Sequence, residues 1–173
     1  MTEVPTAARV QVPLYSPEER RRRDSSVWTP VQGVLAALQF VAFLVSVTLV
    51  ARFLITGAGE TAATISIVVK TGFLFAIMLT GCLWERDVFG RYLFARPFFW
   101  EDVGSIFVIA LHSAYLLALL SHLGGVRAQM FIALAGYAAY ILNATQFLLK
   151  LRAARLQAPR DAPATVALAV TAK

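Results

Sequence analysis

Four long apolar runs, each with at most one or two charged residues, dominate this sequence. They cover residues 31–55, 62–84, 103–123 and 128–149. Each run is long enough to span a bilayer, because about 20 helical residues cross the hydrocarbon core. The connections "TGAGET" and "GGVR" after the first and third runs are short, so neighbouring helices must run antiparallel. The sequence therefore predicts an all-α integral membrane protein, a four-helix antiparallel bundle forming one domain over residues 1–173.

The composition agrees with a membrane protein and excludes several other classes. Hydrophobic residues make up 58% of the chain and charged residues 15%, which is unusual for a soluble domain. Cys82 is the only cysteine, so no internal disulfide can form, and with His112 and His122 it makes no cluster at metal-ligand spacing. The net charge is +6, but no nucleic-acid-binding motif is present. We expect neither a protein-bound metal nor a nucleic-acid partner.

The distribution of lysine and arginine predicts the orientation in the membrane, because the side richer in them stays in the cytoplasm. One side carries only Arg127 and, near a helix end, Arg52. Both termini are therefore predicted to be cytoplasmic. The tails, residues 1–14 and 159–173, lack helical patterning and are predicted to be disordered. The basic residues on the cytoplasmic side are Arg9, Arg20, Arg21, Arg22, Arg23, Arg86, Arg91, Arg96, Lys150, Arg152, Arg155, Arg160 and Lys173.

The stretch "LWERDVFGRYLFARPFFWEDV" connects the second and third runs and is rich in aromatic residues. Tryptophan-glutamate pairs lie at both of its ends, with arginines between them. One interpretation is an amphipathic segment in the headgroup region, with rings pointing inward and arginines toward phosphates. The other is a site framed by the two pairs. For the second interpretation, the candidate substrate-binding residues are Trp84, Arg91, Arg96, Phe99 and Trp100.

Lys70 and His112 are ionisable residues inside predicted spans, where such groups are costly and often functional. Helical rise places Lys70 about 22 Å and His112 about 16 Å from the predicted cytoplasmic boundary. These depths predict contact or a shared cavity. Two plainer explanations stay open: Lys70 extending its stem outward, and His112 as a structural residue with satisfied hydrogen bonds.

Polar residues recur at helical spacing in three of the four predicted spans. If these stripes face each other, the bundle holds a polar pocket that opens beside the aromatic connection. The alternative is a set of interhelical hydrogen bonds worth about 1 kcal/mol each. Among the stripe residues, Gln39 and Asn143 are candidates for binding substrate. The stripes are Gln32, Gln39 and Ser46; Glu101, Asp102, Ser105, His112 and Tyr115; and Tyr140, Asn143, Gln146 and Lys150.

Four carboxylates, Glu85, Asp87, Glu101 and Asp102, gather at the two ends of the connection. A carboxyl group partly withdrawn from water keeps a proton near neutral pH and suits general acid catalysis. Acid/base chemistry on a membrane-dissolved substrate is therefore one interpretation. Simple pairing with the nearby arginines is the other.

Three stretches of the chain are recognisable: "YSPEERRRRDSSVWTPVQGVLAALQF", "SIVVKTGFLFAIMLTGCLWERDVFGRYLFARPFFWEDV" and "ALHSAYL". Together they resemble the vinyl bacteriochlorophyllide hydratase family of bacteriochlorophyll biosynthesis. The resemblance extends over about residues 15–152. It implies addition of water to the C3 vinyl group of chlorophyllide a or a bacteriochlorophyllide, giving a 1-hydroxyethyl group. It also implies a multi-pass protein of the bacterial inner (intracytoplasmic) membrane.

The resemblance implies no organic cofactor, and magnesium enters only within the substrate macrocycle. The expected partners are the pigment, the bilayer and other enzymes of the same pathway. For hydration, Glu101 or Glu85 is our candidate acid, and Asp102 or His112 would orient or deprotonate water. Arg91 or Arg96 would bind the substrate propionate, and Lys70 would hold a carboxylate or pair with an acid.

The sequence is also compatible with two other functions. A pigment-binding or handover protein would hold the macrocycle without changing it, with a neutral His112 nitrogen as magnesium ligand. A small transporter would use Lys70 and the polar stripes as a path, but the sequence shows neither an internal repeat nor a helix broken by Gly or Pro.

Overall fold

The computed structural model describes residues 14–157, with side chains up to residue 153. The tails predicted to be disordered lie outside these residues, apart from Leu14. Within the described chain the all-helical prediction is confirmed, and four helices are long and apolar enough to cross a membrane. The elements are α1 (Pro17–Ser25), α2 (Trp28–Thr56), α3 (Glu60–Phe89), the 3₁₀ turn η1 (Arg96–Phe98), α4 (Phe99–Leu120) and α5 (Val126–Gln157).

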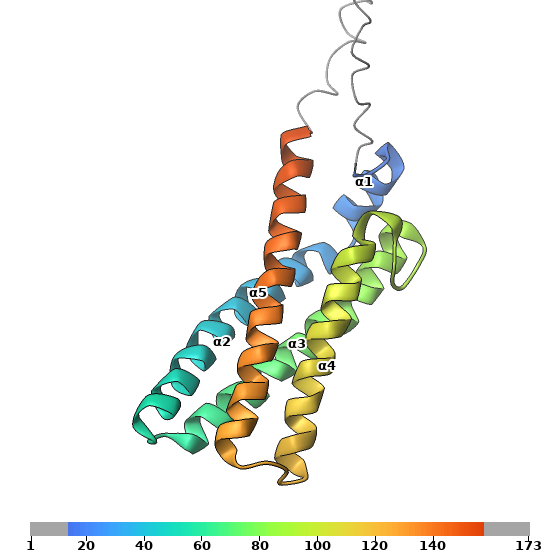
Figure 1. The fold of residues 1–173 in the computed structure, drawn as a ribbon. Helices are drawn as coiled ribbons and strands as arrows, with labels where there is room; N and C mark the ends of the chain where they lie inside the picture. Colours follow the sequence, from blue (N-terminus) through green and yellow to red (C-terminus); the bar gives the residue numbers. More distant parts are fainter. Residues whose placement is uncertain (1–13, 158–173) are drawn as a thin grey trace, which may run out of the picture.

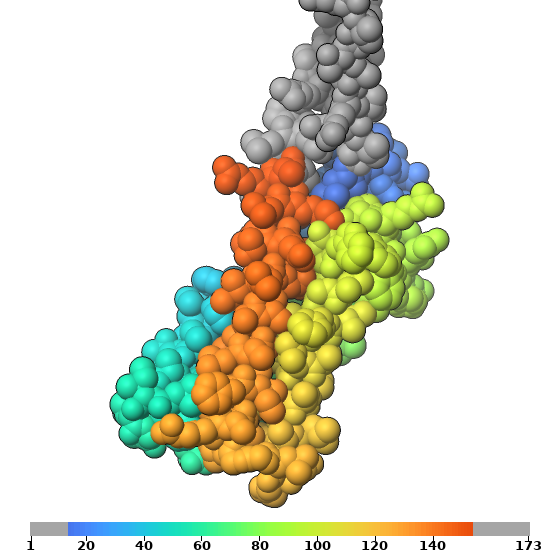
Figure 2. Space-filling model, in the orientation of Figure 1, coloured from blue at the N-terminus to red at the C-terminus, as the bar shows by residue number. Residues whose placement is uncertain are grey.

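The four long helices form two antiparallel hairpins, α2 with α3 and α4 with α5 (Figure 1). Contacts within each hairpin are more extensive than contacts between the hairpins. The two short turns lie together at one end of the bundle, which we call the turn end. Helix α1, the α3–α4 connection and the last turns of α5 lie together at the other end, the connection end (Figures 1 and 2). The chain therefore enters and leaves the bundle on the same side.

The helices flanking the aromatic connection are longer there than the sequence suggested. Helix α3 continues past Glu85 and stops at Gly90, whose φ of 74° is a left-handed conformation that ends helices readily. Helix α4 starts at Phe99, so Glu101 and Asp102 lie in its first turn. Acidic residues are favourable there because of the helix dipole. The carboxylates therefore stand on helices, and only residues 90–98 connect them.

A short helix, α1, carries Arg20, Arg21, Arg22 and Arg23, which are among the basic residues assigned above to the cytoplasmic side. Its start is fixed by Pro17 and by a reciprocal pair of hydrogen bonds between Ser16 and Glu19. Just before it, Tyr15 packs on Phe89, with the Arg23 guanidinium 4.8 Å from its ring centre. Burial raises the pKa of the Tyr15 hydroxyl, although Arg23 opposes the shift. The N-terminal segment is thereby docked on the connection end of α3.

The helices expose apolar side chains and keep most of their polar ones inside, as lipid surroundings favour. Ile55, Leu79 and Leu142 are more than two-thirds exposed. The predicted inward polar stripes are confirmed for the first and third spans, where Gln39 and His112 are buried. For the fourth span, the prediction is wrong at Gln146, whose side chain is exposed.

Gly136 allows α4 and α5 to approach closely, and we expect a side chain there to be destabilising. A Cβ atom at position 136 would lie 2.8 Å from Cε1 of His112, whose ring is held by two hydrogen bonds. Overpacking of this kind costs about 1–3 kcal/mol. Gly136→Ala should lower the free energy of unfolding in detergent by this amount, measured by denaturant titration with circular dichroism.

Gly33→Ala is the matched control, because no atom lies within 4 Å of a Cβ added there. It should be neutral or stabilising by up to about 1 kcal/mol, since alanine is the better helix former. Equal effects of the two substitutions would contradict the close packing at Gly136.

Candidate active site

Two buried carboxyl groups meet at the connection end, Glu85 from α3 and Asp102 from α4. The backbone N–H of Phe94 donates to Asp102 Oδ2 at 2.7 Å, and that of Ala95 donates to Glu85 Oε2 at 3.1 Å. Because Phe94 and Ala95 are consecutive residues, the two carboxyl groups lie next to each other. Two carboxylates repel each other and neither can donate, so a hydrogen bond between them needs a proton on one of them. The arrangement is a carboxyl pair that can share one proton.

Glu101 is placed differently from this pair, because it has a cationic partner. Lys150 of α5 forms an ion pair with it, with 2.6 Å between Nζ and Oε2. Lys150 also donates to the carbonyl of Pro97 and lies 5.1 Å from the ring centre of Phe98. One lysine thus connects α5 to the start of α4 and to η1. It also balances the charge next to Asp102.

An aromatic cluster packs beside these groups, made of residues from α3, η1 and α5 together with Tyr15. Trp84 belongs to it, and its indole N–H donates to Thr29 Oγ1 at 3.0 Å. Trp84 therefore lies inside, whereas Trp100 is 70% exposed. The two tryptophan-glutamate pairs do not face each other across a slot. The cluster consists of Tyr15, Val88 and Phe98, with Leu14, Trp84, Phe89 and Phe147 packed against it.

The structure does not bring every candidate to the carboxyl pair. Arg91 and Arg96 are exposed on the connection, and Phe99 meets Trp100 edge to face at the surface. The remaining acid of the connection, Asp87, is exposed and accepts a hydrogen bond from Ser26 at 2.9 Å. No arginine forms a salt bridge with Glu85 or Asp102 within the described residues.

The second polar centre lies halfway along the bundle, where Lys70 contacts His112 across the two hairpins. Lys70 Nζ lies 2.6 Å from His112 Nε2, and both side chains are fully buried. This confirms the predicted contact and rules out an outward-reaching Lys70. His112 Nδ1 lies 2.8 Å from the Val108 carbonyl, which can only accept. Nδ1 therefore carries the ring proton, and Nε2 accepts from Lys70.

Aromatic and hydroxyl groups surround this pair. The Lys70 ammonium position lies 5.1 Å from the ring centre of Tyr137 and 4.5 Å from that of Tyr140. The hydroxyl of Tyr137 hydrogen-bonds Ser46, which also bonds Ser66 at 2.8 Å. We did not single out Tyr137 and Ser66 from the sequence. Their spacing indicates shared helix faces, because Tyr137 precedes Tyr140 by three residues and Ser66 precedes Lys70 by four.

The two amide candidates lie inside the bundle with part of their bonding capacity unused. Asn143 Nδ2 donates to Ser105 Oγ at 2.9 Å. Gln39 Oε1 and Asn143 Oδ1 are buried without a hydrogen-bond partner in the described part of the chain. Water is the usual partner for such atoms.

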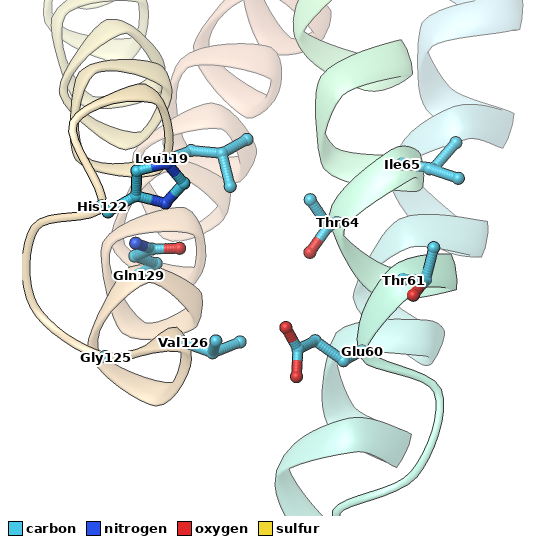
Figure 3. A pocket seen from close by; sticks show the side chains of 9 residues that line it. All are labelled: Glu60, Thr61, Thr64, Ile65, Leu119, His122, Gly125, Val126 and Gln129. Carbon is cyan, nitrogen blue, oxygen red and sulfur yellow. The ribbon is translucent and has the colours of Figure 1, made fainter.

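The carboxyl pair and the Lys70–His112 pair are too far apart to act on one chemical group together. Fifteen residues separate Lys70 from Glu85 on a continuous helix, a rise of about 22 Å. Each pair must therefore have its own role. The pocket drawn in Figure 3 belongs to neither, since residues of the turn end line it.

Loss of the Lys150 ammonium should destabilise the connection end. Lys150→Met leaves Glu101 with a side chain 8% exposed and no described cationic partner, and a lost hydrogen bond to a charged group costs about 1.5–3 kcal/mol. The free energy of unfolding in detergent should fall by about this amount. Lys150→Arg should retain most of the stability.

The double variant Lys150→Met/Glu101→Gln distinguishes the ion pair from simple packing. Removing both charges should recover at least half of the loss, because no unpaired ion remains. If the two single substitutions are additive instead, the pair does not stabilise this end.

Comparison with known proteins agrees with the resemblance stated above. A family model described as 2-vinyl bacteriochlorophyllide hydratase matches residues 15–153. A protein of that name from Rhodobacter capsulatus is 59% identical over 155 residues, covering 90% of each chain. Another from Cereibacter sphaeroides is 58% identical over 144 residues, covering 83% of this chain and 89% of the relative. No solved structure matches. The chain belongs to the 2-vinyl bacteriochlorophyllide hydratase family.

Proposed function

We propose that this protein adds water to the vinyl group of a bacteriochlorophyllide, and that the Glu85–Asp102 pair supplies the proton. The activity follows from membership of the hydratase family. The assignment of the acid rests on one observation: consecutive backbone N–H groups bind two buried carboxyl groups from different helices side by side. Glu101 is the weaker candidate, because its charge is engaged by Lys150.

The reaction needs one proton donor and one proton acceptor, and a carboxyl pair provides both. The protonated carboxyl transfers its proton to the terminal vinyl carbon, which becomes a methyl group. Positive charge develops on the carbon attached to the macrocycle, where conjugation spreads it. A water oxygen bonds to this carbon, and the water's proton passes to the carboxylate. The pair is restored, and one water molecule has been added.

The backbone around the pair suits this cycle. The N–H groups of Phe94 and Ala95 donate to the two carboxyl groups, so they stabilise whichever oxygen bears negative charge after proton transfer. The Lys150–Glu101 ion pair fixes the first turn of α4, and with it Asp102. The chain thus keeps the two oxygens in place while the proton moves.

Surface residues of the connection end are suited to receive a pigment from the bilayer. Phe99 and Trp100 are exposed at the start of α4, where a flat macrocycle can stack on them. Arg91 and Arg96 are exposed on the same connection and can pair with a propionate. In this proposal they bind the entering substrate, and the inner Trp84 supports the carboxyl pair from behind.

The handover function has less support from the geometry. It requires a free His112 nitrogen for magnesium, but Nε2 faces Lys70 and Nδ1 faces a carbonyl. Lys70 would have to move before a metal could bind. Transfer of unchanged pigment therefore remains an outcome to test.

We further propose that the connection end faces the cytoplasm of a phototrophic bacterium, in its inner or intracytoplasmic membrane. Four long apolar helices make the chain a multi-pass protein. The described basic residues of α1, the connection and late α5 support this orientation. Other enzymes of bacteriochlorophyll synthesis would then meet the protein on that face.

Replacing either carboxyl group of the pair should slow hydration strongly, while the protein remains in the membrane. Glu85→Gln and Asp102→Asn should each lower the rate by roughly 10²–10⁴-fold, the usual contribution of general acid/base catalysis. The assay uses membranes of a non-phototrophic host supplied with the vinyl pigment. Product is followed by absorbance and by a mass gain of one water.

Asp87→Asn is the matched control, since this carboxylate is exposed at the same end and, among residues 14–157, bonds only Ser26. It should retain nearly full activity. In heavy water, one deuterium should remain on the product's methyl group. Full activity of both Glu85→Gln and Asp102→Asn would overturn the assignment, and bound pigment of unchanged mass in the parent protein would favour handover.

A further inference from the structure

The turn end holds a pocket that the proposed hydration does not use. It lies between the start of α3 and the α4–α5 turn, with a volume of about 400 Å³. Figure 3 shows Glu60 on one side and His122 and Gln129 on the other. Gln129 donates to the carbonyls of Ala118 and Leu123, so it closes the end of α4. Carboxylate, imidazole and hydroxyl groups make this pocket suitable for water.

A buried hydroxyl links the pocket to the interior. Thr64 lines the pocket and lies beside the hydroxyl of Tyr115. Tyr115 is fully buried, and its hydroxyl has no hydrogen-bond partner within the described chain. A buried polar atom of this kind usually bonds water. On α4, Tyr115 follows His112 by three residues, so the two share one helix face. His122 lies just beyond the end of α4, in the turn that lines the pocket.

This face of α4 leads to His112 and its partner Lys70, for which the described residues supply no carboxylate. Lys70 contacts only an imidazole nitrogen and two aromatic rings, and no carboxylate forms a salt bridge with it among the described residues. An ammonium group in hydrocarbon is costly, so ionisable residues at this depth usually belong to hydrated paths. An amine next to an imidazole can exchange protons with water that reaches it.

We infer that the pocket is the mouth of a hydrated path to the Lys70–His112 pair, by which water and protons reach this pair from the turn end. The carboxyl pair lies at the opposite end and is not part of the path. The path is therefore separate from the proposed hydration, and its existence does not depend on that reaction. The competing arrangement is a dry bundle, in which Ile67, Met130 and Tyr137 of the central core seal the pair from the pocket.

Thiol labelling in native membranes tests the path without measuring activity. The background is Cys82→Ser, because Cys82 is the only cysteine in the sequence. Lys70→Cys is compared with Val69→Cys, which lies at the same depth but faces lipid. A small, charged, membrane-impermeant methanethiosulfonate is applied to one side of sealed vesicles at a time. Ala58→Cys marks the turn end, and Arg91→Cys marks the connection end.

We expect Lys70→Cys to react with the reagent applied to the side that labels Ala58→Cys. It should react roughly tenfold faster or more than Val69→Cys, because only a hydrated thiol forms the reactive thiolate. If Lys70→Cys does not accumulate, His112→Cys replaces it, with the exposed Ala110→Cys as control. Reaction no faster than the lipid-facing control, or reaction only from the side of Arg91→Cys, would overturn the path.

Discussion

The fold depends on one constraint, that hydrocarbon offers no hydrogen-bond partner to a polar group. Polar side chains of the spans must therefore find partners in other helices, and those partners determine how the hairpins meet. Ser46 of α2 bonds Tyr137 of α5, and Lys70 of α3 bonds His112 of α4. Both contacts join one hairpin to the other near the same level. Contacts between the hairpins are fewer than contacts within them, so these polar pairs do much to set the crossing.

The same constraint explains why two polar centres exist at different depths. At the connection end, the chain between α3 and α4 is not helical around Phe94 and Ala95, so their backbone N–H groups are free to bind carboxyl oxygens. Halfway along the bundle all backbone groups are bonded within helices. Only side chains can then satisfy Lys70, and it lies between an imidazole and two aromatic rings. Anionic groups thus belong at the end and a basic pair in the middle.

Sequence patterns predicted the spans and the meeting of Lys70 with His112, because apolar length and depth along a helix are local properties. They did not separate Glu85 and Asp102 from Glu101. That distinction depends on Lys150, which is distant in sequence and reaches Glu101 only after α5 packs beside α4. Side-chain direction was also missed at Trp100, which faces outward although Trp84 faces inward. Long-range pairing and the rotation of a helix start are properties of the folded bundle.

The position of the carboxyl pair near the ends of two candidate membrane spans suits the two reactants of the proposed hydration. The pigment partitions into lipid, whereas water is abundant only outside it, so the reaction must occur where both are within reach. A carboxyl pair deeper in the bundle would retain its proton but lack water, and one in open solvent would lose its proton near neutral pH. Glu85 and Asp102 lie between these extremes, buried at the ends of two spans. Their depth is thus as important to the proposed chemistry as their identity.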